Sequence, residues 1–233
     1  MKKIIFLLTF VISSHLWASN HSLDSTIDKH QSEFENVAMT IWDLAEVGYQ
    51  EYESSKLLQN SLKEHGFRIK TNVADIPTAF IAEYGSGSPV IAILGEFDAL
   101  PGVAQSTSPF KERYKDNQAG HACGHHLFGA GSAWSSVVIK DWIKANNIKG
   151  TIRFYGTPAE EGGSGKVYMT RAGLFNDVDV ALHWHPGSVS HARPRTSNSN
   201  KSARFTFHGI SAHAASAPEQ GRSALDGVES MNM

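Results

Sequence analysis

The sequence predicts an α/β fold in which a mixed, mainly parallel sheet is flanked by helices. Three observations support this. Strand-like runs alternate with stretches of helical periodicity, which is typical of sheets with right-handed crossovers. The run Val90–Leu94 is continuously apolar, as expected for a strand buried on both faces of a parallel sheet. After Pro186 the chain becomes rich in Ser, Asn and Arg, which indicates that a second region begins there.

Two helices are expected before the first strand. Apolar side chains recur at helical spacing over residues 25–45, with Ser25 in position to cap the helix. A second helix is expected over Glu51–His65, and Gly66 should end it in the left-handed conformation. We expect both helices to have a packing role and assign them no chemistry.

Four strands and a long helix follow. The helix is expected over Leu127–Ala145, because Trp134, Val138 and Trp142 fall on one of its faces. The strands are expected at Ala79–Tyr84, Val90–Leu94, Thr151–Tyr155 and Val178–Trp184. We place a domain boundary near residue 190, which gives a first domain over 19–190 and the beginning of a second over 191–233. The second should contain a strand at Ala203–Phe207 and a helix from Ala224 onward.

The first 18 residues have the pattern of a secretory signal peptide. Lys2 and Lys3 precede the apolar run Ile4–Ile12, and Ala18 is a suitable cleavage point. The run is shorter than the roughly 20 residues that a membrane-spanning helix needs. An uncleaved anchor is the alternative. We therefore expect an exported protein, periplasmic or secreted, with no membrane segment after cleavage.

Charge and cysteine content narrow the function classes. The formal net charge is -2, and no block of Lys and Arg occurs beyond the N-terminus, so nucleic acid is not expected as a partner. The chain contains 12 His and a single Cys. A lone cysteine in an exported protein cannot form an internal disulfide, so Cys123 is free, paired with another molecule or bound to a ligand.

Polar residues directly follow three of the predicted strands. They are Asp98, the pair Glu160 and Glu161, and the histidines His183 and His185. Ligands of open α/β sheets bind outside the carboxyl ends of the strands, so we expect these residues to share one site. Only one of the two histidines is expected to face the site.

The segment His121–His126 opens the long helix and supplies further metal-binding groups. Cys123 and His125 are separated by one Gly, whose backbone freedom lets both side chains turn toward one point. Thiolate, imidazole and carboxylate form a donor set that suits zinc, and imidazole with carboxylate also suits manganese. The alternative is an inert, buried cysteine near surface histidines.

The carboxylates also have two interpretations each. One of Glu160 and Glu161 can bind a metal while the other acts as a general base, or the pair forms a solvated acidic turn. Asp98 can orient a metal-bound histidine, or it can be a turn or cap residue.

Five motifs occur in a fixed order, and together they identify a resemblance. They are GEFDALPG, GHACGHHLFGAGS, FYGTPAEEGGSGK, ALHWHPG and GISAHAASAPEQGRSALD. The series resembles the aminoacylase and hippurate-hydrolase family of dimetal amidohydrolases, and it is most similar to the aminobenzoyl-glutamate hydrolase branch. The resemblance extends from about Thr40 to the end of the chain.

The resemblance implies a site with two divalent metal ions, manganese or zinc. Cys123 would bridge the ions, and His125 and Glu161 would be further ligands. The fourth ligand would be His183 by the wider family pattern or His185 by the branch pattern, and we favour His185.

Catalytic roles also follow from the resemblance. Glu160 would be the general base that activates water, and Asp98 would be the supporting carboxylate. His213 matches a lid-domain histidine that reaches the site of a neighbouring subunit in related dimers and helps hold the substrate carbonyl.

The implied fold is a zinc-peptidase-like catalytic domain over 19–190, followed by the beginning of a lid and dimerisation domain. The substrate would be an N-acyl or N-aroyl amino acid or a similar dipeptide, and the assembly a homodimer or a heteromer with a related subunit. Relatives are about twice as long and supply another histidine ligand later, so we expect an incomplete site and a polypeptide that folds poorly or is inactive alone. The alternative function is a non-catalytic fragment or binding protein.

A serine hydrolase is disfavoured, because the chain has no Gly-x-Ser-x-Gly motif.

Overall fold

The computed structural model describes the backbone of residues 2–114, 118–192, 196 and 198–233, and side chains from residue 23 onward. The chain divides into two compact units, Met1–Ser188 and Val189–Met233, which are described separately. The side chains of the predicted signal peptide lie outside the described residues.

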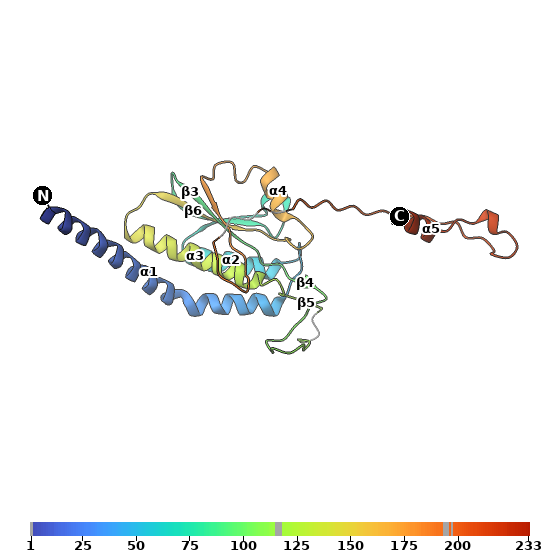
Figure 1. Ribbon diagram of the computed structural model, residues 1–233, viewed down its shortest axis with the longest axis horizontal. Coiled ribbons are helices and arrows are strands. Elements are labelled where there is room, and N and C mark those ends of the chain that lie inside the picture. Colours follow the sequence, from blue (N-terminus) through green and yellow to red (C-terminus); the bar gives the residue numbers. More distant parts are fainter. Residues whose placement is uncertain (1, 115–117, 193–195, 197) are drawn as a thin grey trace. The chain divides into compact units, whose positions relative to one another are not determined.

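The first unit is built on a five-stranded mixed sheet, which confirms the predicted fold class (Figure 1). Its strands, in spatial order, are β1 (Arg68–Thr71), β2 (Phe80–Ser86), β6 (Gly150–Gly156), β3 (Val90–Gly95) and β7 (Val180–Leu182). The three strands β6, β3 and β7 run parallel, whereas β2 is antiparallel to both β1 and β6. Strands β4 (Leu100–Pro101) and β5 (Ala119–Gly120) form a separate two-stranded ladder.

Both faces of the sheet are covered, because successive side chains of its central strands alternate between two cores. Ile93 and its partner Phe154 enter one core, whereas Leu94 and its partner Tyr155 enter the other. Helices α1 (Lys2–Leu44), α2 (Tyr52–Glu64) and α3 (His125–Ala145) cover the first face. Helix α4 (Gly165–Arg171) and the 3-10 turn η1 (Val73–Asp75) cover the second. This burial on two faces explains the continuous apolar run of β3.

The helix predictions succeed where a helix packs on the sheet. Helix α2 matches the prediction, and Gly66 follows it with a φ of +86°. Helix α3 begins at His125, two residues earlier than expected. The expected start of the first helix is wrong, because Ser25 lies inside α1 and does not cap it. The periodic apolar residues over 25–45 include those through which α1 contacts the core, and the helical backbone begins further toward the N-terminus.

Two strand predictions need correction, and both failures concern backbone pairing. The run Val178–Trp184 forms a strand only over Val180–Leu182, the part that pairs with β3. Residues 203–207 form no strand, because no described part of the chain pairs with them. Strand formation needs a hydrogen-bonded neighbour, which an apolar pattern alone does not guarantee. The short elements β1, β4, β5 and α4 were not predicted.

The second unit contains little regular structure. Ile210 and Arg222 form an isolated bridge, the 3-10 turn η2 covers Pro218–Gln220, and helix α5 covers Ala224–Met231. Helix α5 was predicted, and the Ser223 hydroxyl caps it by accepting a hydrogen bond from the Asp226 amide at 3.1 Å. Among the described residues of the whole chain, each helix is too short or too polar to span a membrane.

Candidate metal centre

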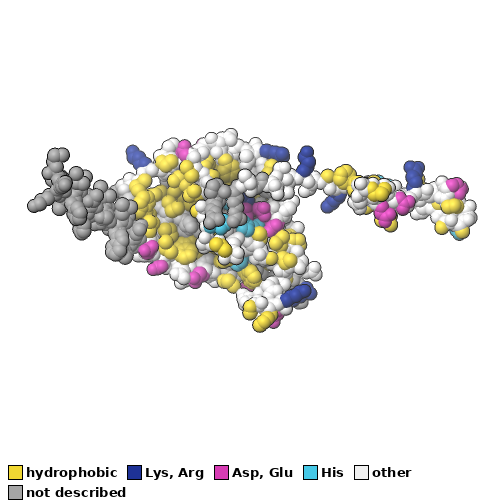
Figure 2. All heavy atoms as spheres, in the orientation of Figure 1, with side chains coloured by type: hydrophobic (Ala, Val, Ile, Leu, Met, Phe, Trp, Pro, Cys, Tyr) yellow, Lys and Arg dark blue, Asp and Glu magenta, His cyan; other side chains and the backbone are white. Residues whose placement is uncertain are grey.

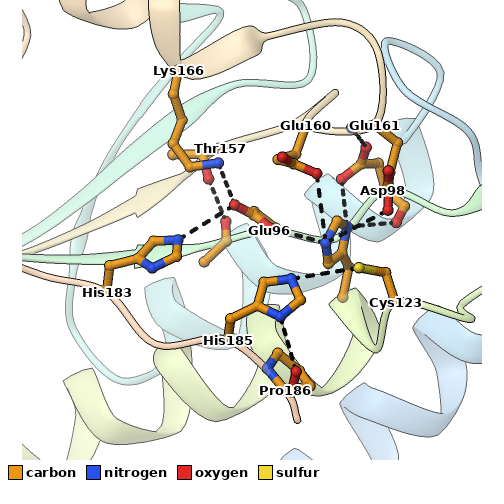
Figure 3. Close-up of polar contacts among 12 residues, drawn as sticks. Glu96, Asp98, Cys123, Thr157, Glu160, Glu161, Lys166, His183, His185 and Pro186 are labelled. Carbon is orange, nitrogen blue, oxygen red and sulfur yellow. Dashed lines mark hydrogen bonds and ion pairs between the residues drawn. The ribbon is translucent and has the colours of Figure 1, made fainter. Parts of the chain in front are cut away.

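Four polar segments of the first unit meet at one edge of the sheet. Strands β3, β6 and β7 are parallel, so their carboxyl ends lie together, and α3 begins beside them. Figure 2 shows histidine and acidic side chains gathered on this unit. Figure 3 shows the side chains of the four segments pointing toward one another. The segments are 96–98, 123–125, 160–161 and 183–185, and we refer to them as the strand-end site.

His125 lies at the middle of the strand-end site and is fully buried. Its Nδ1 lies 2.9 Å from Asp98 Oδ1 and 3.1 Å from the Asp98 carbonyl oxygen. Both of these atoms accept hydrogen bonds, so Nδ1 is protonated, and Nε2 is the nitrogen that a neutral ring leaves available to a metal. The Nε2 atom lies 2.9 Å from Glu96 Oε2, at ion-pair distance. Asp98 therefore aims the free nitrogen of His125 into the site.

Cys123 and His185 form the second part of the site. Cys123 Sγ lies 3.5 Å from His185 Nε2, and both atoms are within 4.8 Å of a ring nitrogen of His125. His185 Nδ1 donates to the Pro186 carbonyl oxygen at 2.9 Å, so its Nε2 presents a lone pair toward the thiol. A thiol and two imidazole groups thus converge on one point, as metal ligands must.

The two histidines of the 183–185 segment take different positions. His183 Nε2 lies 3.5 Å from Glu96 Oε1 and belongs to no group with Cys123. His185 is the one that joins Cys123 and His125. Because β7 ends at Leu182, strand alternation no longer dictates where these two side chains point.

The acidic pair lies beside His125 and is partly held by backbone contacts. Glu160 Oε2 lies 3.9 Å and Glu161 Oε1 4.0 Å from His125 Nε2. The Glu161 amide donates to Asp98 Oδ2 at 2.8 Å, so Asp98 positions both a histidine and the acidic turn. Burial raises the pKa of Glu160, and the nearby carboxylates of Glu96 and Glu161 raise it further.

Glu96 is a member of the site that the sequence analysis missed. It is 2% exposed, forms an ion pair with Lys166, and lies near His125 and His183. Burial opposes ionisation, but these cationic or hydrogen-bonding neighbours hold the pKa of Glu96 well below its usual range. Its signal was present, because Glu96 is the first residue after β3 and lies in the same motif as Asp98.

The electrostatics of the site favour a bound cation. Burial raises the pKa of the Cys123 thiol, and the carboxylate of Glu161 raises it further, to about 12. Burial lowers the pKa of His125, but Asp98 and Glu96 outweigh it and raise that pKa to about 10. Neighbouring carboxylates contribute to both shifts, so negative charge surrounds these two groups. A divalent cation would neutralise this charge and allow Cys123 to ionise.

Unsatisfied polar atoms support the same conclusion. Among the described residues, six buried side-chain atoms make no hydrogen bond. Three of them lie in the strand-end site: Glu161 Oε1, and the atoms Glu96 Oε2 and His125 Nε2, which lie at ion-pair distance from each other. Buried polar atoms in folded proteins almost always have a partner, and a bound cation would provide one for these three atoms. With Cys123 and His185, these residues provide the thiolate, imidazole and carboxylate donors that zinc and manganese accept. The residues therefore fit a metal site.

His213 lies in the second unit, in the segment before η2. Its Nδ1 accepts hydrogen bonds from the amides of Ala215 and Ser216, each at 3.2 Å. The proton of a neutral His213 ring is therefore on Nε2, which is left as a hydrogen-bond donor.

A separate group of histidines and carboxylates lies where α1, α2 and α3 pack together, and we call it the helix cluster. His30, Glu33 and His65 lie close enough to hold a cation. Here, however, His65 Nε2 lies 2.9 Å from Glu33 Oε2 and His30 Nε2 lies 3.0 Å from Asp141 Oδ2. Asp141 also pairs with Lys140. Each group has a partner, and we interpret this cluster as a polar packing contact.

Comparison with known proteins assigns the family. Residues 92–220, more than half of the chain, match the sequence profile of peptidase family M20/M25/M40. The chain belongs to this family. The match includes every predicted site residue, from Asp98 to His213. The resemblance identified from the five motifs is thereby confirmed.

Individual relatives agree with the family assignment. The chain is 42% identical over 210 residues to a subunit of the p-aminobenzoyl-glutamate hydrolase of Escherichia coli, covering 90% of this chain and 44% of the relative. It is 31% identical over 157 residues to hippurate hydrolase of Campylobacter jejuni, covering 66% and 39%. The chain thus spans less than half the length of these relatives.

A solved structure supports the fold. The YXEP protein of Bacillus subtilis, a dinuclear metal-binding peptidase of the M20 family, superposes with a TM-score of 0.51 and 30% sequence identity. The superposition covers 66% of this chain and 43% of the other. The predicted metallopeptidase-type fold is confirmed by this similarity.

Proposed function

We propose that this protein is a metal-dependent amidohydrolase that cleaves the amide bond of an N-acyl or N-aroyl amino acid. The observation that carries the proposal is the convergence of Cys123, His125 and His185 beside the carboxylate of Glu160. This arrangement supports a site in which metal ligands lie next to a group that can transfer a proton. The activities in the names of the two curated relatives support this substrate class.

Four residues would hold two divalent metal ions, manganese or zinc. They are Cys123, His125, Glu161 and His185, and we propose Cys123 as the bridge between the ions. When bound, such ions lower the pKa of a coordinated water and polarise the substrate carbonyl. Asp98 prepares the protein for this role, because it fixes the tautomer of His125 and holds the Glu161 amide.

Glu160 is proposed as the general base and acid. Its side chain is 45% exposed, so it is accessible to water and substrate, and its pKa is raised toward the range useful for proton transfer. Glu160 would take a proton from the attacking water and return it to the leaving amine. Glu161 is less exposed and its amide is held by Asp98, which suits a fixed ligand better than a proton carrier.

His213 is proposed to donate a hydrogen bond from Nε2 to the substrate carbonyl oxygen in the site of a neighbouring subunit. The tautomer set by its Nδ1 contacts supports this role, because it leaves Nε2 protonated. We propose a homodimer or a heteromer with a related subunit, and the Escherichia coli relative, which is named as one subunit of a hydrolase, supports the heteromer. We also propose export through the N-terminal segment.

The test uses the product of the complete open reading frame that contains this chain. With manganese or zinc added, it should hydrolyse p-aminobenzoyl-glutamate or hippurate, and a chelator should abolish the rate. Glu160→Ala should reduce kcat about 10²- to 10⁴-fold while metal content stays unchanged. Glu64→Ala, an exposed carboxylate on α2, is the matched control and should keep the wild-type rate.

Two outcomes would count against the proposal. Full activity of Glu160→Ala would show that the base is assigned wrongly. Metal binding without hydrolysis of any N-acyl or N-aroyl amino acid would favour the alternative, a binding protein that retains the hydrolase fold.

A further inference from the structure

A short segment between α1 and α2 lies against the turn that carries Glu160 and Glu161. Its last residue, Glu51, is fully buried. Glu51 Oε1 accepts a hydrogen bond from the Ala159 amide at 2.8 Å, and Oε2 accepts one from the Thr78 hydroxyl at 3.0 Å. Both carboxylate oxygens are therefore engaged, and one of them holds the residue directly before Glu160.

Helix capping does not explain why a carboxylate is buried at this position. Glu51 occupies the N-cap position of α2, but its side chain makes no capping hydrogen bond. Glu46 takes that role, since its carboxylate accepts from the amides of Glu53 at 3.1 Å and Ser54 at 2.8 Å. The side chain of Glu51 is thus available for the contact with Ala159.

Ala159 has a backbone conformation that needs support. Its φ is +55°, in the left-handed region that residues with a Cβ atom rarely adopt, and it is fully buried. Gly48 lies so close that an added Cβ would be 3.0 Å from Ala159 Cα. Ala159 is therefore held by the segment from Gly48 to Glu51, which packs closely against it at Gly48 and accepts its amide hydrogen bond at Glu51.

Glu160 lies between two fixed amides. On one side Glu51 holds the amide of Ala159, and on the other Asp98 Oδ2 holds the amide of Glu161 at 2.8 Å. The Tyr49 hydroxyl adds a third contact by donating to the Gly163 carbonyl oxygen at 2.7 Å. The direction of the Glu160 side chain depends on the backbone between these anchors.

The two anchors are also tied to each other. The Ala99 amide, next to Asp98, donates to the Glu46 carbonyl oxygen at 2.8 Å, and Val47 forms a bridge with Ala99. The segment Glu46–Glu51 therefore joins the end of β3 to the acidic turn after β6.

We propose that Glu51 is a positioning residue, which holds Ala159 in its left-handed conformation and thereby sets the orientation of Glu160 and Glu161. The inference rests on the proposed function for the roles of these two residues. Glu51 lies outside the strand-end site, and through Ala159 it would keep the proposed base Glu160 and the proposed ligand Glu161 in a fixed orientation relative to each other. Glutamine at position 51 can still accept from the Ala159 amide, alanine cannot, and aspartate is one methylene too short.

The test compares Glu51→Ala, Glu51→Asp and Glu51→Gln with Ser55→Ala in the complete gene product. Ser55 is the matched control, because its hydroxyl makes another buried hydrogen bond from α2, to the Thr78 carbonyl oxygen at 2.7 Å, without contacting Ala159. Hydrogen–deuterium exchange of the peptide spanning residues 157–165 reports on the turn directly. Circular dichroism checks folding, and metal titration and steady-state kinetics report on the site.

Glu51→Ala and Glu51→Asp should speed amide exchange in 157–165 and lower kcat by about 10- to 100-fold, with KM changed much less. Glu51→Gln should stay within about 3-fold of wild type in kcat, because it keeps the hydrogen bond to Ala159. Ser55→Ala should lower the melting temperature but leave exchange in 157–165 and kcat unchanged. If Glu51→Ala does not fold, amide exchange and kcat of Glu51→Asp test the proposal instead.

Wild-type exchange in 157–165 for Glu51→Asp would overturn the proposal, and so would equal acceleration in Ser55→Ala. A wild-type protein without amidohydrolase activity would refute the proposed function instead. The exchange measurement would still show whether Glu51 holds the turn.

Discussion

Histidine and carboxylate side chains meet at two places in the first unit, and the two groups differ in how their atoms are satisfied. In the helix cluster, His65 pairs with Glu33 and His30 pairs with Asp141. In the strand-end site, the buried atom Glu161 Oε1 has no hydrogen-bond partner, and Glu96 Oε2 lies at ion-pair distance from His125 Nε2. Both groups contain histidines and carboxylates, and the carboxylate of Glu161, which keeps an unpartnered buried oxygen, distinguishes the strand-end site from the helix cluster.

The two groups also differ in how far nearby lysines offset their negative charge. Lys140 and Lys29 lie near Asp141 in the helix cluster, so its negative charge is already offset. In the strand-end site, Lys166 forms an ion pair with Glu96. Neighbouring carboxylates nevertheless contribute to raising the pKa values of Cys123 and His125. A cation would therefore be bound more favourably at the strand-end site.

The largest effect is expected from removing the proposed bridging ligand. Cys123→Ala should reduce the metal content from two ions per chain to fewer than one and lower kcat/KM by about 10³-fold or more. His65→Ala, in the helix cluster, should leave both unchanged. Metal analysis by mass spectrometry checks the content. A lower ion count in His65→Ala would show that the helix cluster also binds metal.

The next largest effect separates the two histidines at the end of β7. His185→Ala should weaken metal binding by about 100-fold, whereas His183→Ala should weaken it by less than about 10-fold, as expected for a residue outside the ligand set. His183 contacts only Glu96 at the site, whereas His185 faces Cys123. Competition with a chelating dye measures both affinities. The reverse order would assign the ligand role to His183.

A smaller effect concerns the pH dependence of stability at Glu51. Burial raises the pKa of Glu51 from 4.5 to about 7, so the folded protein binds this proton more tightly than the unfolded chain. Its contribution to the free energy of unfolding is then present at low pH and lost as pH rises through about 7, by up to about 3 kcal/mol. Glu51→Gln does not titrate, so its stability relative to wild type should rise between pH 5 and pH 8, measured by urea denaturation. A difference that is independent of pH would contradict this assignment.

The smallest effect is expected in the helix cluster. Burial opposes ionisation of Glu33, but hydrogen bonds from Ser61 and His65 outweigh it and lower the pKa. A carboxyl group whose pKa is lowered in the folded state stabilises the fold at pH values above its ordinary pKa. This stabilisation is lost as the pH falls through the lowered pKa. Glu33→Gln should therefore cost less than about 1 kcal/mol at neutral pH, since the pair is partly exposed, and nothing in acid. Melting temperatures at neutral and acidic pH test this, and a larger cost in acid would contradict it.

The sequence alone determined the fold class, most elements that pack on the sheet, and the family. Apolar runs and helical periodicity record burial, and the five motifs record local chemistry, so both are visible without a structure. The same information predicted that polar residues after β3, β6 and β7 would share one edge of the sheet. The structure brings Asp98, Cys123, His125, Glu160, Glu161 and His185 together there.

Only the tertiary structure decided which side chains face one another. It shows His185 rather than His183 beside Cys123, because β7 ends too early for strand alternation to apply. It also shows that Glu96 lies at His125 and that Glu51, 108 residues before Ala159 in sequence, holds its amide. These contacts join segments that are distant along the chain, and no local pattern of residues encodes such pairings. The same limit explains why residues 203–207 resemble a strand in sequence but form none in the structure.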